Sequence, residues 1–139
     1  MQTTAEQNKS AVLRFNKLFI EQGNKDVFKE LIAPDVINHT APPGSPAGAD
    51  GMFNFLQNML RTGFPDLKVD IEDQVAEGDK VTTRKTIRGT HSGLFMGIPA
   101  SGKRVVIKVI DIIRLRNGQY IEHWAASNLA EVMVEINSN

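Results

Sequence analysis

The sequence predicts an α+β fold in which helices pack on one face of an antiparallel sheet. Two observations support this class. Apolar residues recur every three or four positions over residues 5–61, and every second position over most of residues 68–127. These patterns occupy separate parts of the chain, which is typical of α+β proteins. With 139 residues and 41% apolar content, the chain is expected to form a single domain over residues 1–139.

Three helices are expected in the first half of the chain. An apolar stripe predicts a helix over residues 5–22, and shorter helices are expected over residues 25–32 and 50–61. Residues 35–40 are expected to be extended. Residues 41–51 contain three Pro and three Gly and form a loop by composition.

Four antiparallel strands are expected in the second half. Glu77-Gly78-Asp79 and Asn117-Gly118 are turn sequences, and a Gly- and Pro-containing connection covers residues 93–102. The expected strands are residues 68–75, 80–90, 104–115 and 119–127. We expect the sheet to curve strongly around the helices and to enclose a pocket, where the chemistry of the protein is to be sought.

Composition and charge exclude several classes of function. Sixteen basic and sixteen acidic side chains give a net charge of zero, so neither nucleic acid nor a membrane is an expected partner. No cysteine is present, and the first ten residues lack an apolar segment, so we expect a cytoplasmic protein. The His spacing fits no metal motif, and no nucleotide-binding loop occurs. We therefore predict no metal and no cofactor.

The most informative residue is Asp111. Every second residue from Val105 to Leu115 is apolar except Asp111, so the alternation places its carboxylate on the core-facing side. A carboxylate in an apolar interior is suited to proton transfer. Alternatively it is structural, paired with Lys85 or an Arg, or bonded to loop backbone. Lys85 lies on the same side and either pairs with a buried carboxylate or extends to an opening, of which we favour the second.

The three histidines are further candidates. His91 shares the parity of the inward-facing residues and is expected at the inner rim of the sheet, where the Gly-rich loop begins. It either donates to a substrate carbonyl or only binds the loop backbone. His39 lies at the start of the Pro/Gly loop. Alternation directs His123 inward and Trp124 outward, although one bulge would exchange them.

Aromatic residues supply the remaining candidates for ligand contact. Phe15, Phe53 and Phe95 are candidates to line a cavity for a hydrophobic ligand, although for Phe53 we favour a plain core position. Trp124 suits a pocket wall or an interface. The loop over residues 92–103 is expected to fold over the pocket mouth, with Phe95 on its apolar underside. Valine and isoleucine side chains on the outward face of the third strand predict at least a homodimer.

Several short strings in order resemble the SnoaL-like polyketide cyclase family. The matching segments are residues 64–67, 77–81, 89–93, 97–103 and 122–124, together with His39, Asp111 and Gly118. The resemblance covers nearly the whole chain. It implies a cone-shaped nuclear transport factor 2-like fold with a short N-terminal strand at residues 35–40, in dimers or tetramers.

The resemblance also implies a reaction. Characterised members are cofactor-free ester cyclases that close the last ring of aromatic polyketide esters by an intramolecular aldol reaction, and the Asp that matches Asp111 acts there as the acid/base. The sequence departs from the pattern at Asn128, where the family often has Asp, and at Lys85, where an aromatic or aliphatic residue is common. These departures imply a smaller and more polar pocket.

Two functions follow. In the first, the protein is a cyclase or isomerase in which Asp111 removes a proton next to a carbonyl of a small hydrophobic substrate. In the second, it is a noncatalytic ligand-binding or dimeric accessory protein, with Asp111 neutralised by Lys85. A cavity bordered by Asp111 with His91 in reach favours the enzyme. A filled cavity with Asp111 bound to Lys85 favours the second function.

Overall fold

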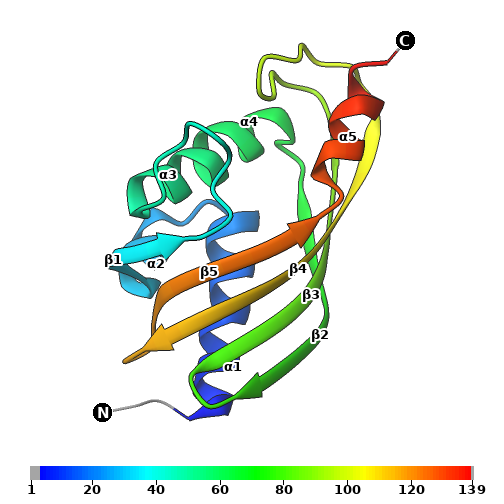
Figure 1. Ribbon diagram of the computed structural model, residues 1–139. Coiled ribbons are helices and arrows are strands. Elements are labelled where there is room, and N and C mark those ends of the chain that lie inside the picture. The colour runs from blue at the N-terminus through cyan, green and yellow to red at the C-terminus, as the bar shows by residue number, and fades with distance from the viewer. Residues whose placement is uncertain (1–3, 139) are drawn as a thin grey trace.

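Helices and a mixed five-stranded sheet form separate layers in the computed structural model, which describes residues 4–138 (Figure 1). The predicted α+β class is therefore confirmed. The strands are β1 (Ile32–Asn38), β2 (Lys68–Glu77), β3 (Lys80–Thr90), β4 (Arg104–Arg116) and β5 (Gln119–Ser127). Their order across the sheet is β1-β5-β4-β3-β2, so the four predicted strands form an antiparallel meander.

The first helix forms where the apolar stripe predicts it. Helix α1 (Ala5–Arg14) begins with a capping box in which Thr4 and Gln7 bond each other's backbone N–H groups. It continues without interruption into the π-helical segment η1 (Phe15–Glu21), and α2 (Lys25–Leu31) follows. The large apolar residues of η1 and α2 lie in one core beneath the sheet.

The third predicted helix is built from three consecutive segments, α3 (Ala49–Phe53), η2 (Asn54–Leu60) and α4 (Arg61–Gly63). A further helix, α5 (Leu129–Ile136), was not predicted. It has only eight residues, and it buries Val132 and Ile136 while it packs against β4. A helix this short depends on tertiary packing, so its own pattern is a weak signal. No helix within residues 4–138 has the length and apolar content that a membrane span requires.

The extended segment near residue 35 is a strand of the main sheet. Strand β1 pairs in parallel with β5 and begins at Ile32, three residues earlier than predicted. It lies at the sheet edge, where Pro34 removes no hydrogen bond from a central ladder. Through this pairing Asn38 lies opposite His123, which brings the Pro/Gly loop after β1 next to the inner face of β5.

A bulge between β4 and β5 decides which side chains of β5 face inward. Arg114 pairs with Glu122, but the next residue, Leu115, pairs with Tyr120, so one residue of β5 is left out of the ladder. Tyr120 and His123 would lie on opposite faces of a regular strand, whereas the bulge turns both of them inward.

Candidate functional site

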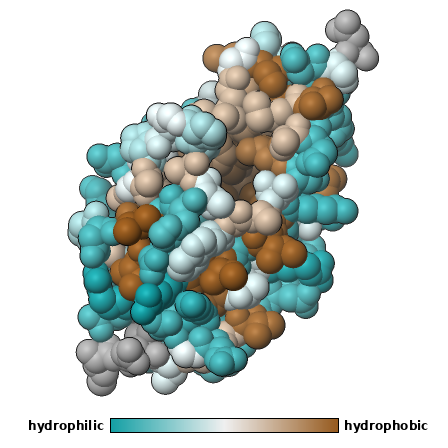
Figure 2. All heavy atoms as spheres, in the orientation of Figure 1, coloured by the Kyte–Doolittle hydropathy of each residue, from teal (hydrophilic) through white to brown (hydrophobic). Residues whose placement is uncertain are grey.

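A cavity of about 290 Å³ lies between the helices and the inner face of the sheet. Figure 2 shows the surface hollowed between the helical layer and strand β5, with apolar residues around the hollow. Most of the lining is apolar, including Met52, Phe55, Leu56, Leu60, Ile107 and Val109. The polar lining residues are Asn38, Thr40, Lys85, Asp111, Tyr120, His123 and Ser127.

Asp111 lies in the cavity wall, on the inner face of β4, as the alternation predicts. Its residue surface is only 3% exposed. Oδ2 is 3.2 Å from Nζ of Lys85, whereas Oδ1 is buried and has no hydrogen-bond partner among residues 4–138. A buried carboxylate oxygen without a donor is uncommon, because the loss of hydration is then uncompensated. The carboxylate group as a whole belongs to a residue that lines the cavity.

Lys85 is the partner of Asp111, so the expectation that it extends to an opening is wrong. The two residues are diagonal neighbours on adjacent strands, since Lys85 pairs with Val109 and Asp111 with Thr83. The Lys85 side chain is 7% exposed, and Nζ donates a hydrogen bond of 2.7 Å to Oδ1 of Asn16. Asn16 and Asp111 thus hold the Lys85 amine inside the protein. If the amine moved to an opening, the Asp111 carboxylate would stay buried without its counterion.

Asn16 belongs to this group, although the sequence analysis did not single it out. It lies in η1 and is buried, and its Nδ2 donates to the Val12 carbonyl at 2.9 Å. This bond turns Oδ1 of Asn16 toward Lys85. The available signal was an amide four residues after Val12, on the apolar stripe of the first helix.

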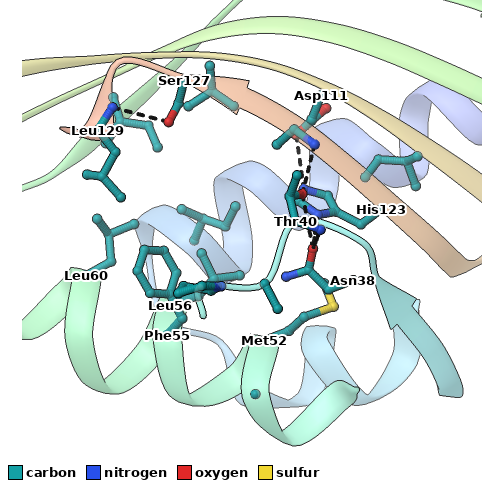
Figure 3. A pocket seen from close by; sticks show the side chains of 18 of the residues that line it. Asn38, Thr40, Met52, Phe55, Leu56, Leu60, Asp111, His123, Ser127 and Leu129 are labelled. Carbon is teal, nitrogen blue, oxygen red and sulfur yellow. Dashed lines mark hydrogen bonds and ion pairs between the residues drawn. The ribbon is translucent and has the colours of Figure 1, made fainter. Parts of the chain in front are cut away.

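His123 is held in one orientation by the last residue of β1 (Figure 3). Its Nδ1 is 2.8 Å from Oδ1 of Asn38, which also accepts the Thr40 backbone N–H at 3.1 Å. Because that oxygen is an acceptor, Nδ1 of His123 carries the proton and Nε2 presents a lone pair. Nε2 is 3.9 Å from Oδ2 of Asp111.

Burial keeps the His123 ring neutral. Desolvation lowers its pKa from 6.5 to about 4, and the nearby charge of Lys85 acts in the same direction. The charge of Asp111 opposes both effects but is smaller than the desolvation. At neutral pH the cavity wall therefore contains the Lys85–Asp111 pair and a neutral imidazole beside it.

A family model for SnoaL-like polyketide cyclases matches residues 10–136 of the chain. The chain belongs to the SnoaL-like polyketide cyclase family. No curated protein matched the sequence. The family carries the nuclear transport factor 2-like fold, in agreement with the layers and sheet order of this chain.

Solved structures agree with this assignment. A candidate SnoaL-like polyketide cyclase from Jannaschia sp. CCS1 has a TM-score of 0.85 and 29% identity, with 100% of this chain and 99% of that chain covered. IdmH, a candidate polyketide cyclase from Streptomyces antibioticus, has a TM-score of 0.81 and 31% identity, with 95% and 99% covered. TsrD from Streptomyces laurentii has a TM-score of 0.84 and 25% identity, with 99% and 100% covered.

Tyr120 is a polar residue of this SnoaL-like site that the sequence analysis missed. It is 2% exposed, lines the cavity and packs against Phe15 with 4.7 Å between ring centroids. Burial, and then the charge of Asp111, raise the pKa of its phenol well above 10, so the phenol stays protonated. Only the bulge in β5 turns this residue inward, and a regular alternation does not reveal it.

His91 lies outside the cavity lining of the SnoaL-like protein, contrary to the expectation that it points into the cavity. Its ring is fully buried against Phe64, with 5.5 Å between centroids. Nδ1 accepts the Ser101 backbone N–H at 3.1 Å and lies 2.9 Å from the Ser101 hydroxyl. These contacts match the alternative in which His91 binds the loop.

The loop after β3 also lies elsewhere than expected. Phe95 is fully buried against Phe64 and Phe55, and Gly63 of α4 leaves room for it, since a Cβ at Gly63 would lie 2.6 Å from that of Phe95. The segment that borders the cavity is the Pro/Gly loop after β1, through Thr40, Ala41, Pro42 and Pro46. The loop that borders the cavity is therefore a different one from the loop that the sequence predicts.

The other aromatic candidates divide between the cavity and its surroundings. Phe15 lines the cavity, whereas Phe53 packs in the core against Phe19 and Phe28, as favoured from the sequence. Trp124 faces away from the cavity lining and stacks on His39 at 4.7 Å between centroids. Residues 4–138 contain no cluster of three His, Cys, Asp or Glu side chains that could hold a metal ion.

Proposed function

We propose that this SnoaL-like protein is a cofactor-independent acid/base catalyst that removes a proton next to a carbonyl group of a small hydrophobic substrate. The reaction is an aldol cyclisation of the polyketide type or a related isomerisation. The observation that carries the proposal is the buried Asp111 carboxylate, whose Oδ1 has no hydrogen-bond partner within residues 4–138 in the wall of a mostly apolar cavity. Such an oxygen can accept a proton from a bound carbon acid.

The groups around Asp111 suit the charge that develops in such a reaction. Removal of the proton leaves an enolate, and the positive charge of Lys85 stabilises an oxyanion placed near it. The apolar lining from α3 and η2 limits water and holds the hydrocarbon part of the substrate. A cavity of about 290 Å³ suits a ligand of one or two rings.

The test is solvent deuterium exchange at the carbon next to the carbonyl of phenylacetone, followed by NMR. We expect exchange above the buffer rate, and we expect Asp111→Asn to lower it by roughly two to four orders of magnitude. The variant is compared only after circular dichroism shows that it is folded. Equal rates in wild type and a folded Asp111→Asn variant would remove Asp111 from the mechanism.

A second function is favoured by the Lys85–Asp111 ion pair. If the pair is structural, the protein binds a small apolar ligand without transforming it. We then expect phenylacetone to raise the melting temperature while no exchange occurs. Exchange that depends on Asp111 would exclude this function.

We also propose a homodimer through the outer face of the sheet. Val106, Ile110 and Ile112 of β4 are 41%, 51% and 38% exposed on that face. Adjacent exposed aliphatic side chains on one sheet face are typical of an interface. Light scattering should give twice the monomer mass, and Ile110→Lys should shift it to the monomer. A wild-type monomer at micromolar concentration would refute the proposal.

A further inference from the structure

The proposed acid/base chemistry leaves the amine of Lys85 unused as a nucleophile. Lys85 lines the cavity although its side chain is only 7% exposed. Proteins use a desolvated lysine amine in an apolar pocket to condense with carbonyl compounds. We propose that Lys85 forms a protonated imine with the carbonyl carbon of a small aromatic ketone or aldehyde bound in this cavity.

Two acceptors position Nζ of Lys85 for this step. Oδ1 of Asn16 is 2.7 Å away, and Oδ2 of Asp111 is 3.2 Å away. Asn16 cannot turn freely, because its Nδ2 donates to the Val12 carbonyl. An ammonium group has three protons, so these two acceptors leave one position of Nζ for a ligand.

The charge of the site is the same before and after condensation. The Lys85 ammonium and the Asp111 carboxylate form a buried pair, and separating such a pair strands a charge. A protonated imine also carries one positive charge on the same nitrogen. Asp111 therefore pairs with the imine as it pairs with the ammonium, and the product needs no new counterion.

The chemistry balances with the two side chains alone. Asp111 first takes a proton from the Lys85 ammonium, which frees the lone pair of Nζ to form a bond with the carbonyl carbon. The former carbonyl oxygen then takes one proton back from Asp111 and a second proton from the nitrogen. With these two protons the oxygen leaves as water. The products are one protonated imine, one carboxylate and one water, with no oxidation or reduction.

This inference rests on the proposed function only in that both require a carbonyl ligand in the same cavity. With the imine formed, the Asp111 carboxylate is again free to remove the neighbouring proton, which gives an enamine in place of an enolate. An iminium withdraws electrons more strongly than a neutral carbonyl, so the same base acts on a more acidic carbon.

The experiment traps the imine with sodium cyanoborohydride. The folded protein is incubated with phenylacetone and the reductant, and intact mass and peptide mapping locate the alkylated amine. The chain has nine lysines, so the other eight are internal controls. We expect one added group on Lys85, at about ten-fold or more the level on any other lysine, although Lys85 is buried and the exposed lysines are more accessible.

Variants separate capture by the site from random alkylation. Lys85→Arg keeps the positive charge beside Asp111 but cannot form the imine, so the single adduct should disappear. Lys29→Arg on the exposed surface is the matched control and should leave the adduct unchanged. Asp111→Asn keeps the amine but removes the proton carrier and counterion, so the adduct should decrease by about ten-fold.

Each result decides between the two proposals. Labelling spread over the surface lysines, with Lys85 unmodified, would overturn this inference. Deuterium exchange without an adduct would overturn it as well and leave the proposed function intact. An adduct on Lys85 without exchange would support the inference and count against the proposed proton abstraction. Because the peptide map and the exchange rate of the wild-type protein give these results, they do not depend on the folding of any variant.

Discussion

The protein contains two clusters of buried polar side chains, and they differ in what surrounds them. In one, Asp111, Lys85 and Asn16 meet at the cavity wall. In the other, His91 is held by Ser101 and packed against Phe64. Each contains one buried polar atom without a hydrogen-bond partner among the described residues, Oδ1 of Asp111 and Nε2 of His91. Only the first of these residues lines a cavity.

The difference shows that an unpaired polar atom indicates a binding site only where there is room for a partner. Asp111 lines a cavity of about 290 Å³, so a ligand bound there lies next to its carboxylate and can supply the missing donor. Nε2 of His91 is enclosed by side chains, and Nδ1 already secures the loop to the end of β3. We therefore expect substitutions in the first cluster to affect chemistry and stability, and those in the second to affect stability alone.

The largest effect is expected for Asp111→Asn. The change leaves the Lys85 ammonium buried without its counterion, which costs about 3 kcal/mol or more of unfolding free energy. Urea unfolding measures this loss. The double variant Asp111→Asn/Lys85→Met removes both charges and should recover much of it. A double variant as unstable as the single would show that the ion pair is not the source of the cost.

Acid should destabilise the protein through His123. Its pKa in the folded protein, about 4, lies below the ordinary 6.5. Between pH 4 and pH 6.5 the unfolded chain therefore binds a proton at His123 that the folded protein does not bind. Stability should therefore decrease as the pH falls from about 6.5 to about 4, by about 3 kcal/mol in total.

The measurement is the unfolding free energy of wild type minus that of His123→Gln across this range, because all other ionisable groups are common to both proteins. The difference should favour wild type less as the pH falls. A difference in unfolding free energy that does not change with pH would mean that burial does not hold His123 neutral. The polar end of the cavity would then be solvated.

A smaller effect is expected for His91→Phe, which keeps the ring shape but removes the acceptor of the Ser101 N–H. The loss of this buried bond should cost about 1–3 kcal/mol. Amide hydrogen exchange over residues 92–103 should become faster, while exchange of deuterium into phenylacetone stays the same. A lower rate of deuterium exchange into phenylacetone in a stably folded variant would contradict the distinction between the two clusters. It would make His91 part of the candidate site.

Periodicity alone predicted a substantial part of this molecule. The change from a helical to an alternating apolar pattern predicted the α+β class, the first three helices and the four strands of the meander. Because side chains alternate across a strand, a single carboxylate among apolar neighbours was enough to place Asp111 inward. The ordered strings around it led to the family that the comparisons show.

Other features were decided only by the tertiary structure, because they depend on contacts between residues distant in the chain. The β3–β4 register places Lys85 next to Asp111, and Asn16, 69 residues earlier, supplies a second acceptor for its amine. Tyr120 and His123 both face inward because of a bulge that no local pattern marks. The packing of Phe95 on α4 takes the loop after β3 away from the cavity. Sequence periodicity determines which face a side chain occupies, whereas the partner it meets there depends on how the elements pack.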